Sequence, residues 1–233
     1  MNNNLENDVR ILRREEGERS VKMFARLYLS RHIEIPPSKA HEEVYGLLDE
    51  SFKRRGSKIA VAAPRGFGKS TVITLVYILY CVCYKKEPFI MVLSHSKSQA
   101  CLILENVRRE LETNEKIHSD FPELLSDKPK PWNHDQIQTL NGVRVAAFGF
   151  AQSIRGRKHG EHRPSLVIGD DLEKADFGFN PETKEKLRNW FEQAALEIGN
   201  RETNHMLIGN FYHPECLLGE YIDEQKHPDW IKK

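Results

Sequence analysis

The chain alternates short apolar runs with amphipathic stretches, and this alternation predicts strands that alternate with helices. The strand-type runs are rich in β-branched and aromatic residues: 58–63, 88–96, 137–149 (as a hairpin), 165–171 and 205–211. The helix-type stretches carry a 3.6-residue apolar period or a continuous apolar run: one or two helices within 1–30, then 38–52, 71–84, 98–114 and 181–198. The proline-punctuated stretch 117–135 predicts irregular structure.

This order of elements predicts an α/β fold with a mainly parallel, doubly wound central sheet flanked by helices. The run 88–96 shows little alternation, as expected for a strand that is covered on both faces. Asn141-Gly142 between two strand-type runs predicts a hairpin turn. We expect a helical N-terminal segment, 1–35, ahead of an α/β domain, 36–220.

Composition narrows the class of protein. Among 233 residues, 39% are apolar, which is enough for a core, and the net charge of +1 confines any nucleic-acid contact to a local patch. The longest apolar run, 71–84, is shorter than the about 20 residues that span a bilayer, so no membrane segment is expected. The four cysteines form no Cys-x-x-Cys pair, which favours reduced thiols over a structural metal site.

The stretch Ala62–Thr71, AAPRGFGKST, resembles the phosphate-binding pattern Gly-x-x-x-x-Gly-Lys-Ser/Thr, with Ala63 in the first glycine position. A small residue fits there if its φ is negative. It stands between a predicted strand and a predicted helix, so its backbone N–H groups can hold phosphate at a helix N-terminus. Lys69 can reach the β- and γ-phosphates of ATP, and the Ser70 hydroxyl can ligate Mg²⁺. The expected nucleotide-binding residues are Pro64, Arg65, Gly66, Phe67, Gly68, Lys69, Ser70 and Thr71. The competing interpretation is an ordinary strand-to-helix turn.

The run SLVIGDDLE places acids at the end of a predicted strand. In P-loop enzymes such an acid holds Mg²⁺, and a neighbouring acid polarises the attacking water. Asp170 fits the metal-binding position. For the catalytic base, Asp171 and Glu173 remain alternatives.

Three segments together resemble the ATPase domain of the large terminase subunit of tailed bacteriophages: APRGFGKST, GFAQSIRGRKHGEHRPSLVIGDDLE and MLIGNFYHP. The resemblance covers about 36–214. It implies a P-loop NTPase fold of the RecA/ASCE-like type that hydrolyses ATP to move double-stranded viral DNA into a procapsid in the host cell cytoplasm. It also implies contacts with a portal protein and a small terminase subunit. The motor would assemble into a ring on the procapsid, and the isolated domain can be a monomer.

The family joins this motor to a C-terminal nuclease of RNase-H-like fold, for which this length leaves no room. The resemblance therefore implies a motor domain alone, with 221–233 as the start of a linker and without nuclease activity.

The resemblance also implies roles for single residues. Gly209 and Asn210 match a coupling motif that senses the γ-phosphate, where the family often has threonine or serine. His41, within 36–42, matches an adenine-side segment. Arg155 is the first choice for an arginine finger that reaches a neighbouring subunit, with Arg157 beside it.

Arginine and lysine clusters leave further alternatives open. Arg65 can stabilise the developing charge on the γ-phosphoryl group in cis. The basic loop that holds Arg155 and Arg157 also fits a solvated loop or a phosphate contact with DNA. The segments 53–55, 108–109 and 128–130 are candidate DNA contacts, although each also fits a solvated helix face.

Three other functions are compatible with a phosphate loop. A helicase-like motor would need a second RecA-like domain. A P-loop kinase of a small metabolite would need a lid, for which 152–163 is the candidate. A nucleotide-bound assembly protein would need no base, and the acids after the strand disfavour it.

Overall fold

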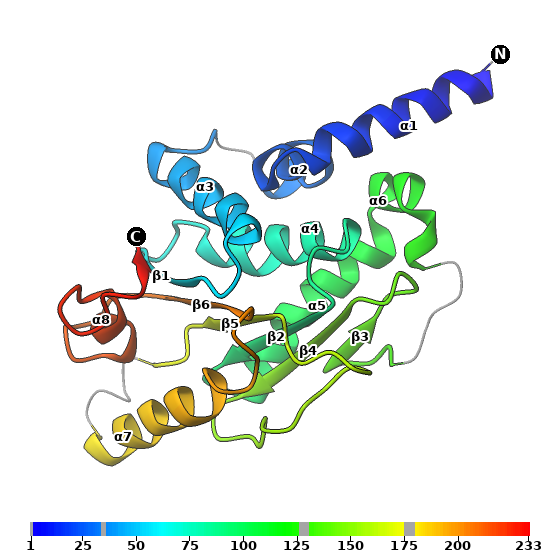
Figure 1. Cartoon of the computed structure of the whole chain (residues 1–233). Helices are drawn as coiled ribbons and strands as arrows, with labels where there is room; N and C mark the ends of the chain where they lie inside the picture. The colour runs from blue at the N-terminus through cyan, green and yellow to red at the C-terminus, as the bar shows by residue number, and fades with distance from the viewer. Residues whose placement is uncertain (1, 34–35, 126–130, 175–179) are drawn as a thin grey trace.

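The computed structural model describes residues 2–33, 36–125, 131–174 and 180–233, which build one seven-stranded sheet between two layers of helices (Figure 1). The strand order is β3-β4-β2-β5-β6-β1-β7. Only β3 runs antiparallel to its neighbour among these paired strands. The strands are β1 (Lys58–Ala62), β2 (Phe89–Ser94), β3 (Gln136–Gln138), β4 (Arg144–Gly149), β5 (Leu166–Asp170), β6 (Asn204–Gly209) and β7 (Ile231–Lys232). The predicted α/β fold with a mainly parallel sheet is confirmed.

The helices divide between the two faces of the sheet, and alternate strand residues point into each layer. On β1, Ile59 and Val61 pack in the layer of α2, α3, α4 and α5, whereas Ala60 packs in the layer of α7 and α8. Because helices cover both faces of the sheet, these strands are continuous apolar runs in the sequence. The α-helices are α1 (Asn2–Glu18), α2 (Val21–Tyr28), α3 (Lys39–Lys53), α4 (Tyr77–Cys83), α5 (Lys97–Thr113), α6 (Glu115–Asp120), α7 (Pro181–Trp190) and α8 (Leu217–Ile222). The 3₁₀ and π segments are η1 (Ser30–His32), η2 (Ser70–Val76), η3 (Pro122–Leu124) and η5 (Phe191–Ala195).

Most predicted elements are confirmed, with local differences. Ser38 caps α3 as expected, in a capping box completed by His41. The hairpin joins β3 to β4, and Gly142 adopts a φ of +91° in the turn. The prediction of irregular structure after 117 was wrong at its start, because α6 extends to Asp120. Asn114 supplies the cap, since its side chain accepts from the N–H of Ile117.

The two terminal segments pack on the body of the fold. Asp120 is fully buried and accepts hydrogen bonds from Arg13 and from the Tyr28 hydroxyl, which fastens α1 and α2 to α6. Residues 221–233 lie against the other face, with Tyr221 and Trp230 buried, and β7 pairs with β1. The division of the chain into three parts stays a prediction.

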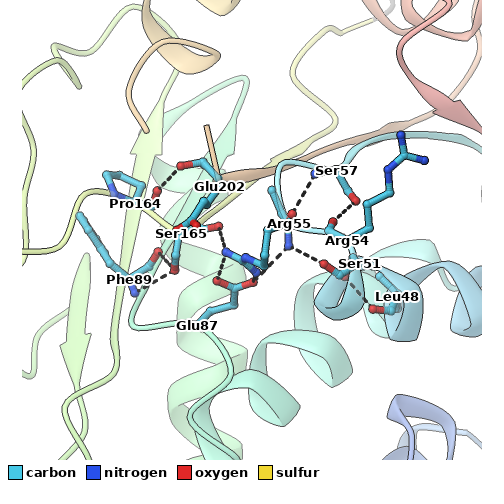
Figure 2. Close-up of polar contacts among 12 residues, drawn as sticks. Leu48, Ser51, Arg54, Arg55, Ser57, Glu87, Phe89, Pro164, Ser165 and Glu202 are labelled. Carbon is cyan, nitrogen blue, oxygen red and sulfur yellow. Dashed lines mark hydrogen bonds and ion pairs between the residues drawn. The ribbon is translucent and has the colours of Figure 1, made fainter. Parts of the chain in front are cut away.

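A buried ion pair joins the segments that lead into the strands (Figure 2). Glu87 is fully buried, and the Arg55 guanidinium donates to both of its carboxylate oxygens, at 2.5 and 3.0 Å. Arg55 also donates to the carbonyl of Ser165 at 3.0 Å, directly before β5. Asn204, the first residue of β6, donates to Glu87 at 3.3 Å. One carboxylate thereby connects the entrances of β1, β2, β5 and β6.

None of the helices in the described part of the chain is long and apolar enough to cross a membrane.

We expect Arg55→Met to destabilise the fold by about 3–5 kcal/mol at pH 7, because it leaves the Glu87 carboxylate buried without a partner. Burial already raises the pKa of Glu87, so its ionised form costs stability that is recovered as the pH falls. The loss should therefore shrink towards pH 4 in urea unfolding curves. Arg54→Met, at the exposed neighbouring arginine, should stay within about 0.5 kcal/mol. Equal unfolding midpoints for the two variants would contradict the role of the pair.

Candidate phosphate and metal site at the carboxyl edge of the sheet

The glycine loop (Ala62–Thr71) leaves the end of β1 and enters η2. Gly66 and Gly68 have φ values of +82° and +80°, which only glycine adopts readily, so both positions require their residue type. Ala63 is not among the described residues with a positive φ, as the sequence predicted for a tolerated alanine. Its N–H donates to the carbonyl of Gly209 at 3.2 Å, which seats the loop on β6.

The helix after the loop begins at the carboxyl edge of the sheet. Lys69 has helical dihedrals and precedes η2, which continues into α4. The first N–H groups of a helix have no acceptor within it, and its N-terminus carries partial positive charge. The loop therefore presents backbone donors and the Lys69 ammonium to the same space.

A chain of hydrogen bonds joins the glycine loop after β1 to the ends of β6 and β5. Lys69 Nζ donates to Asn210 Oδ1 at 3.1 Å. Asn210 donates from its side-chain and backbone nitrogens to Asp171 Oδ1, at 3.3 and 3.2 Å. A Cβ on Gly209 would lie 3.0 Å from the same oxygen, so glycine there lets Asp171 approach. The predicted coupling residues thus lie between the loop lysine and the acids.

Asp170 is a buried carboxylate with spare coordinating capacity. It is 3% exposed, and its Oδ1 has no hydrogen-bond partner, while Thr74 reaches Oδ2 only at 3.5 Å. Burial, helped by the charge of Asp171, raises the pKa of Asp170 to about 6, and a hydrogen bond from Ser70 partly offsets this.

These residues fit Mg²⁺, because Asp170 keeps one carboxylate oxygen without a partner and its carboxyl group lies within reach of the Ser70 hydroxyl. Mg²⁺ takes few protein ligands and completes its shell with water and phosphate. Among the described residues no group of three or more His, Cys, Asp or Glu side chains is placed to hold a metal alone. Ser70 and Asp170 therefore remain the metal candidates that the sequence predicted.

The two candidate catalytic bases, Asp171 and Glu173, differ in the contacts that hold their side chains. Asp171 has a φ of +45°, a strained conformation that places it at the strand end between Asn210 and His95. His95 hydrogen-bonds to its carbonyl at 3.1 Å. Glu173 is 8% exposed, and its Oε2 accepts the N–H of Leu217 at 2.5 Å, at the start of α8. The carboxylate of Glu173 thus has a structural partner in the backbone of α8.

These groups line one cavity of about 860 Å³. Its predicted members are Arg65, Gly66, Lys69, Ser70, Thr71, Asp170, Asp171, Glu173 and Asn210. It also includes residues that sequence reasoning did not assign to the site: His32, Thr74, His95, Gln99, Asn106, Arg109 and Tyr212. The spacing of Gln99, Asn106 and Arg109 places them on one helix face, but only the packing of α5 shows that this face borders the glycine loop.

Arg155 and Arg157 lie outside this cavity. Arg155 donates to the carbonyl of Gln193 at 3.0 Å, and the guanidinium of Arg157 lies 5.4 Å from the ring centre of Phe148. Both side chains are exposed. Within one chain, Arg65 is the predicted finger residue that reaches the cavity.

His41 borders a second, smaller cavity of about 340 Å³ together with Phe67, Gly68 and the first turn of η2. Its ring stacks on Phe67 with 4.1 Å between ring centres, and its Nε2 lies 2.6 Å from the Phe67 carbonyl oxygen. His41 therefore supports the glycine loop directly.

The candidate DNA segments separate in the structure. Lys53 pairs with Glu50 and Arg55 with Glu87, whereas Arg109 borders the main cavity. Lys128–Lys130 lie outside the described residues.

No protein-family model matches the sequence.

We expect Asp170→Asn to stabilise the metal-free protein at pH 8 by about 1–3 kcal/mol. The folded-state pKa of about 6 lies above the ordinary value of 3.8, so ionisation of this carboxyl costs stability as the pH rises. The gain should vanish near pH 4. MgCl₂ should raise the melting temperature of the unchanged protein and leave that of the variant unaffected. Asp8→Asn on the exposed face of α1 is the control, and a variant less stable than the parent at pH 8 would contradict the prediction.

Proposed function

We propose that this protein is a P-loop ATPase whose glycine loop binds the triphosphate of ATP. The observation that carries the proposal is a pair of incompletely satisfied charges on one cavity wall. Lys69 is 7% exposed, yet within the described chain its ammonium forms no ion pair and bonds only the Asn210 amide. Asp170 Oδ1 is buried without a partner. Buried charges require compensation, and a phosphate with Mg²⁺ supplies the opposite charge to both.

The strand order supports the same class. β6 lies between β1, which carries the glycine loop, and β5, which carries the acids. Asn210 at the end of β6 therefore stands between Lys69 and Asp171 and can respond to the γ-phosphate. Ligands of parallel α/β folds bind at the carboxyl ends of the strands, where this cavity lies.

We further propose that the chain is the motor domain of a terminase large subunit, which packages double-stranded DNA into a procapsid. This step depends on the resemblance of the three segments, and two placements support it: Arg65 borders the cavity, and Asn210 contacts both the loop lysine and an acid. The portal protein, the small terminase subunit and a ring on the procapsid in the host cytoplasm follow as proposed partners and location.

In this mechanism the chain positions and stabilises charge. The loop N–H groups and Lys69 would bind the β- and γ-phosphates, and Ser70 and Asp170 would hold Mg²⁺, which would neutralise the developing phosphate charge. Asp171 orients and polarises the attacking water, since its Oδ1 is fixed by Asn210. Loss of the γ-phosphate would remove a partner of Lys69 and thereby change its hydrogen bond to Asn210.

The arginines divide into one cis and two trans candidates. Arg65 lies at the cavity and can stabilise the transferred phosphoryl group directly. Arg155 and Arg157 are exposed and can act only on the nucleotide of a neighbouring subunit. The loop 152–163 contributes no residue to the cavity, which disfavours a kinase with this loop as a lid.

Lys69→Ala should reduce phosphate release from ATP by at least about 100-fold, because it removes the cation at the developing charge. Steady-state hydrolysis with and without duplex DNA measures this, and a DNA-packaging motor should be stimulated by the duplex. Lys226→Ala, an exposed lysine elsewhere, should hydrolyse ATP like the parent. Unchanged hydrolysis by the Lys69 variant would exclude the proposed ATPase site.

Asp171→Asn should abolish most turnover, by about 10²–10⁴-fold, while MgADP still binds, because general-base catalysis needs the carboxylate. Glu173→Gln should keep most turnover, since the glutamine carbonyl can still accept the N–H of Leu217. Single-turnover rates and calorimetric titration with MgADP separate chemistry from binding. The opposite order of the two variants would assign the base to Glu173.

A further inference from the structure

Helix α5 contributes one wall of the main cavity, with both polar and apolar residues. The lining residues recur on one helix face at spacings of three and four residues: Gln99, Leu102, Ile103, Asn106 and Arg109. Helix α5 packs beside η2 on the same side of the sheet. The cavity therefore extends from the acids, past Thr71 and Thr74 on η2, to Arg109.

The guanidinium of Arg109 is oriented but has no anionic partner among the described residues. Its Nη2 donates to Asn106 Oδ1 at 2.8 Å, one turn earlier on the same face. Some arginines of the fold pair with carboxylates, as Arg13 does with Asp120 and Arg188 with Glu220, whereas Arg109 is exposed and faces solvent. One donor of Arg109 is thus used to hold it in place, and the others are available.

His32 connects this wall to the smaller cavity beside His41. Its ring pairs with Glu110 at 2.9 Å, next to Arg109 on α5. His32, Gly66 and Thr71 line both cavities, so the two cavities are neighbours at the glycine loop. Under the proposed function, the phosphate chain of a nucleotide held by the loop would meet its ribose near these shared residues.

The charge of the cavity favours an anion at the α5 end. Four cationic side chains line it, Arg65, Lys69, Arg109 and Lys174, against three carboxylates, Asp170, Asp171 and Glu173. Asp170 ends β5, and Asp171 and Glu173 follow it within three residues. Arg109 is the lining cation that α5 contributes, whereas Arg65 and Lys69 belong to the glycine loop and Lys174 follows the acids.

We propose that Arg109, oriented by Asn106, is a nucleotide-positioning residue that binds the α-phosphate end of the phosphate chain. The assignment rests on the proposed ATP site and adds a contact from a helix outside the glycine loop and the acid strand. A guanidinium presents several parallel donors that match phosphate oxygens, which makes arginine suited to this contact. Because the α-phosphate does not react, the contact is equal in ground and transition states and should affect KM rather than kcat.

Arg109→Gln should weaken MgATP and MgADP binding by the same factor of about ten in calorimetric titrations, since both ligands contain the α-phosphate. KM for ATP should rise similarly while kcat stays unchanged, and Arg109→Lys should recover part of the affinity. The matched control is Arg108→Gln, the same change one residue earlier, at a position that does not line the cavity. Equal melting temperatures of the two variants check that both fold.

The outcomes separate this assignment from the proposed function. If the parent binds nucleotide and Arg109→Gln behaves like Arg108→Gln, the assignment is overturned and the ATP site stands. A variant that loses affinity for MgATP but not for MgADP would also overturn the assignment, because the contact of Arg109 would then be to the γ-phosphate. If the parent binds neither nucleotide, the proposed function fails and the assignment with it.

Discussion

The parallel pairing of β6 with both β1 and β5 is the constraint on which the site depends. In this register Ala62 lies beside Gly209, and Asp170 lies beside Ile208, so the three strands end together. The N–H of Asp171 continues the ladder by donating to Ile208. Groups that are more than a hundred residues apart in sequence therefore meet within hydrogen-bonding distance, and a one-residue slip would turn these side chains to the other face.

The parallel pairing of β6 with β1 and β5 also brings charged side chains together at a buried strand edge, where little water reaches them. Lys69 and Asp170 are both buried, and neither is fully paired by the described chain. Buried charges with incomplete partners lower the stability of the fold. A protein tolerates this cost where a bound ligand supplies the missing partners. The strained φ of Asp171 and the two left-handed glycines of the loop lie at the same edge. Strain and unsatisfied charge thus coincide with the cavity.

Sequence reasoning reached the parts of this site that are encoded locally. Three parts of the site are recognisable from local sequence: the glycine loop, the acids at the end of β5 and the small and polar residues at the end of β6. Strand, turn and helix signals flank each of them within a few residues. The sequence did not indicate that α5 lines the cavity, because Arg109 comes to the cavity only through the packing of α5 beside η2. It also could not choose between Asp171 and Glu173, because the partner of Glu173, the N–H of Leu217, lies 44 residues away. The short helix α6 was missed although its Asn114 cap was visible.

The two ends of the sheet show opposite solutions to the same electrostatic problem. At the amino end, Glu87 is fully buried and Arg55 satisfies both of its oxygens, so that charge is internally compensated and serves to hold the strand entrances together. At the carboxyl end, Lys69 and Asp170 are buried with incomplete partners. The exposed Arg109 of α5 lines the same cavity and has no carboxylate partner within the described chain. An arginine at the first end is part of the scaffold, because its anion comes from the chain. Arg109 is exposed and solvated, so it is available to an anion from outside, and under the proposed function the phosphate chain of the nucleotide supplies that anion.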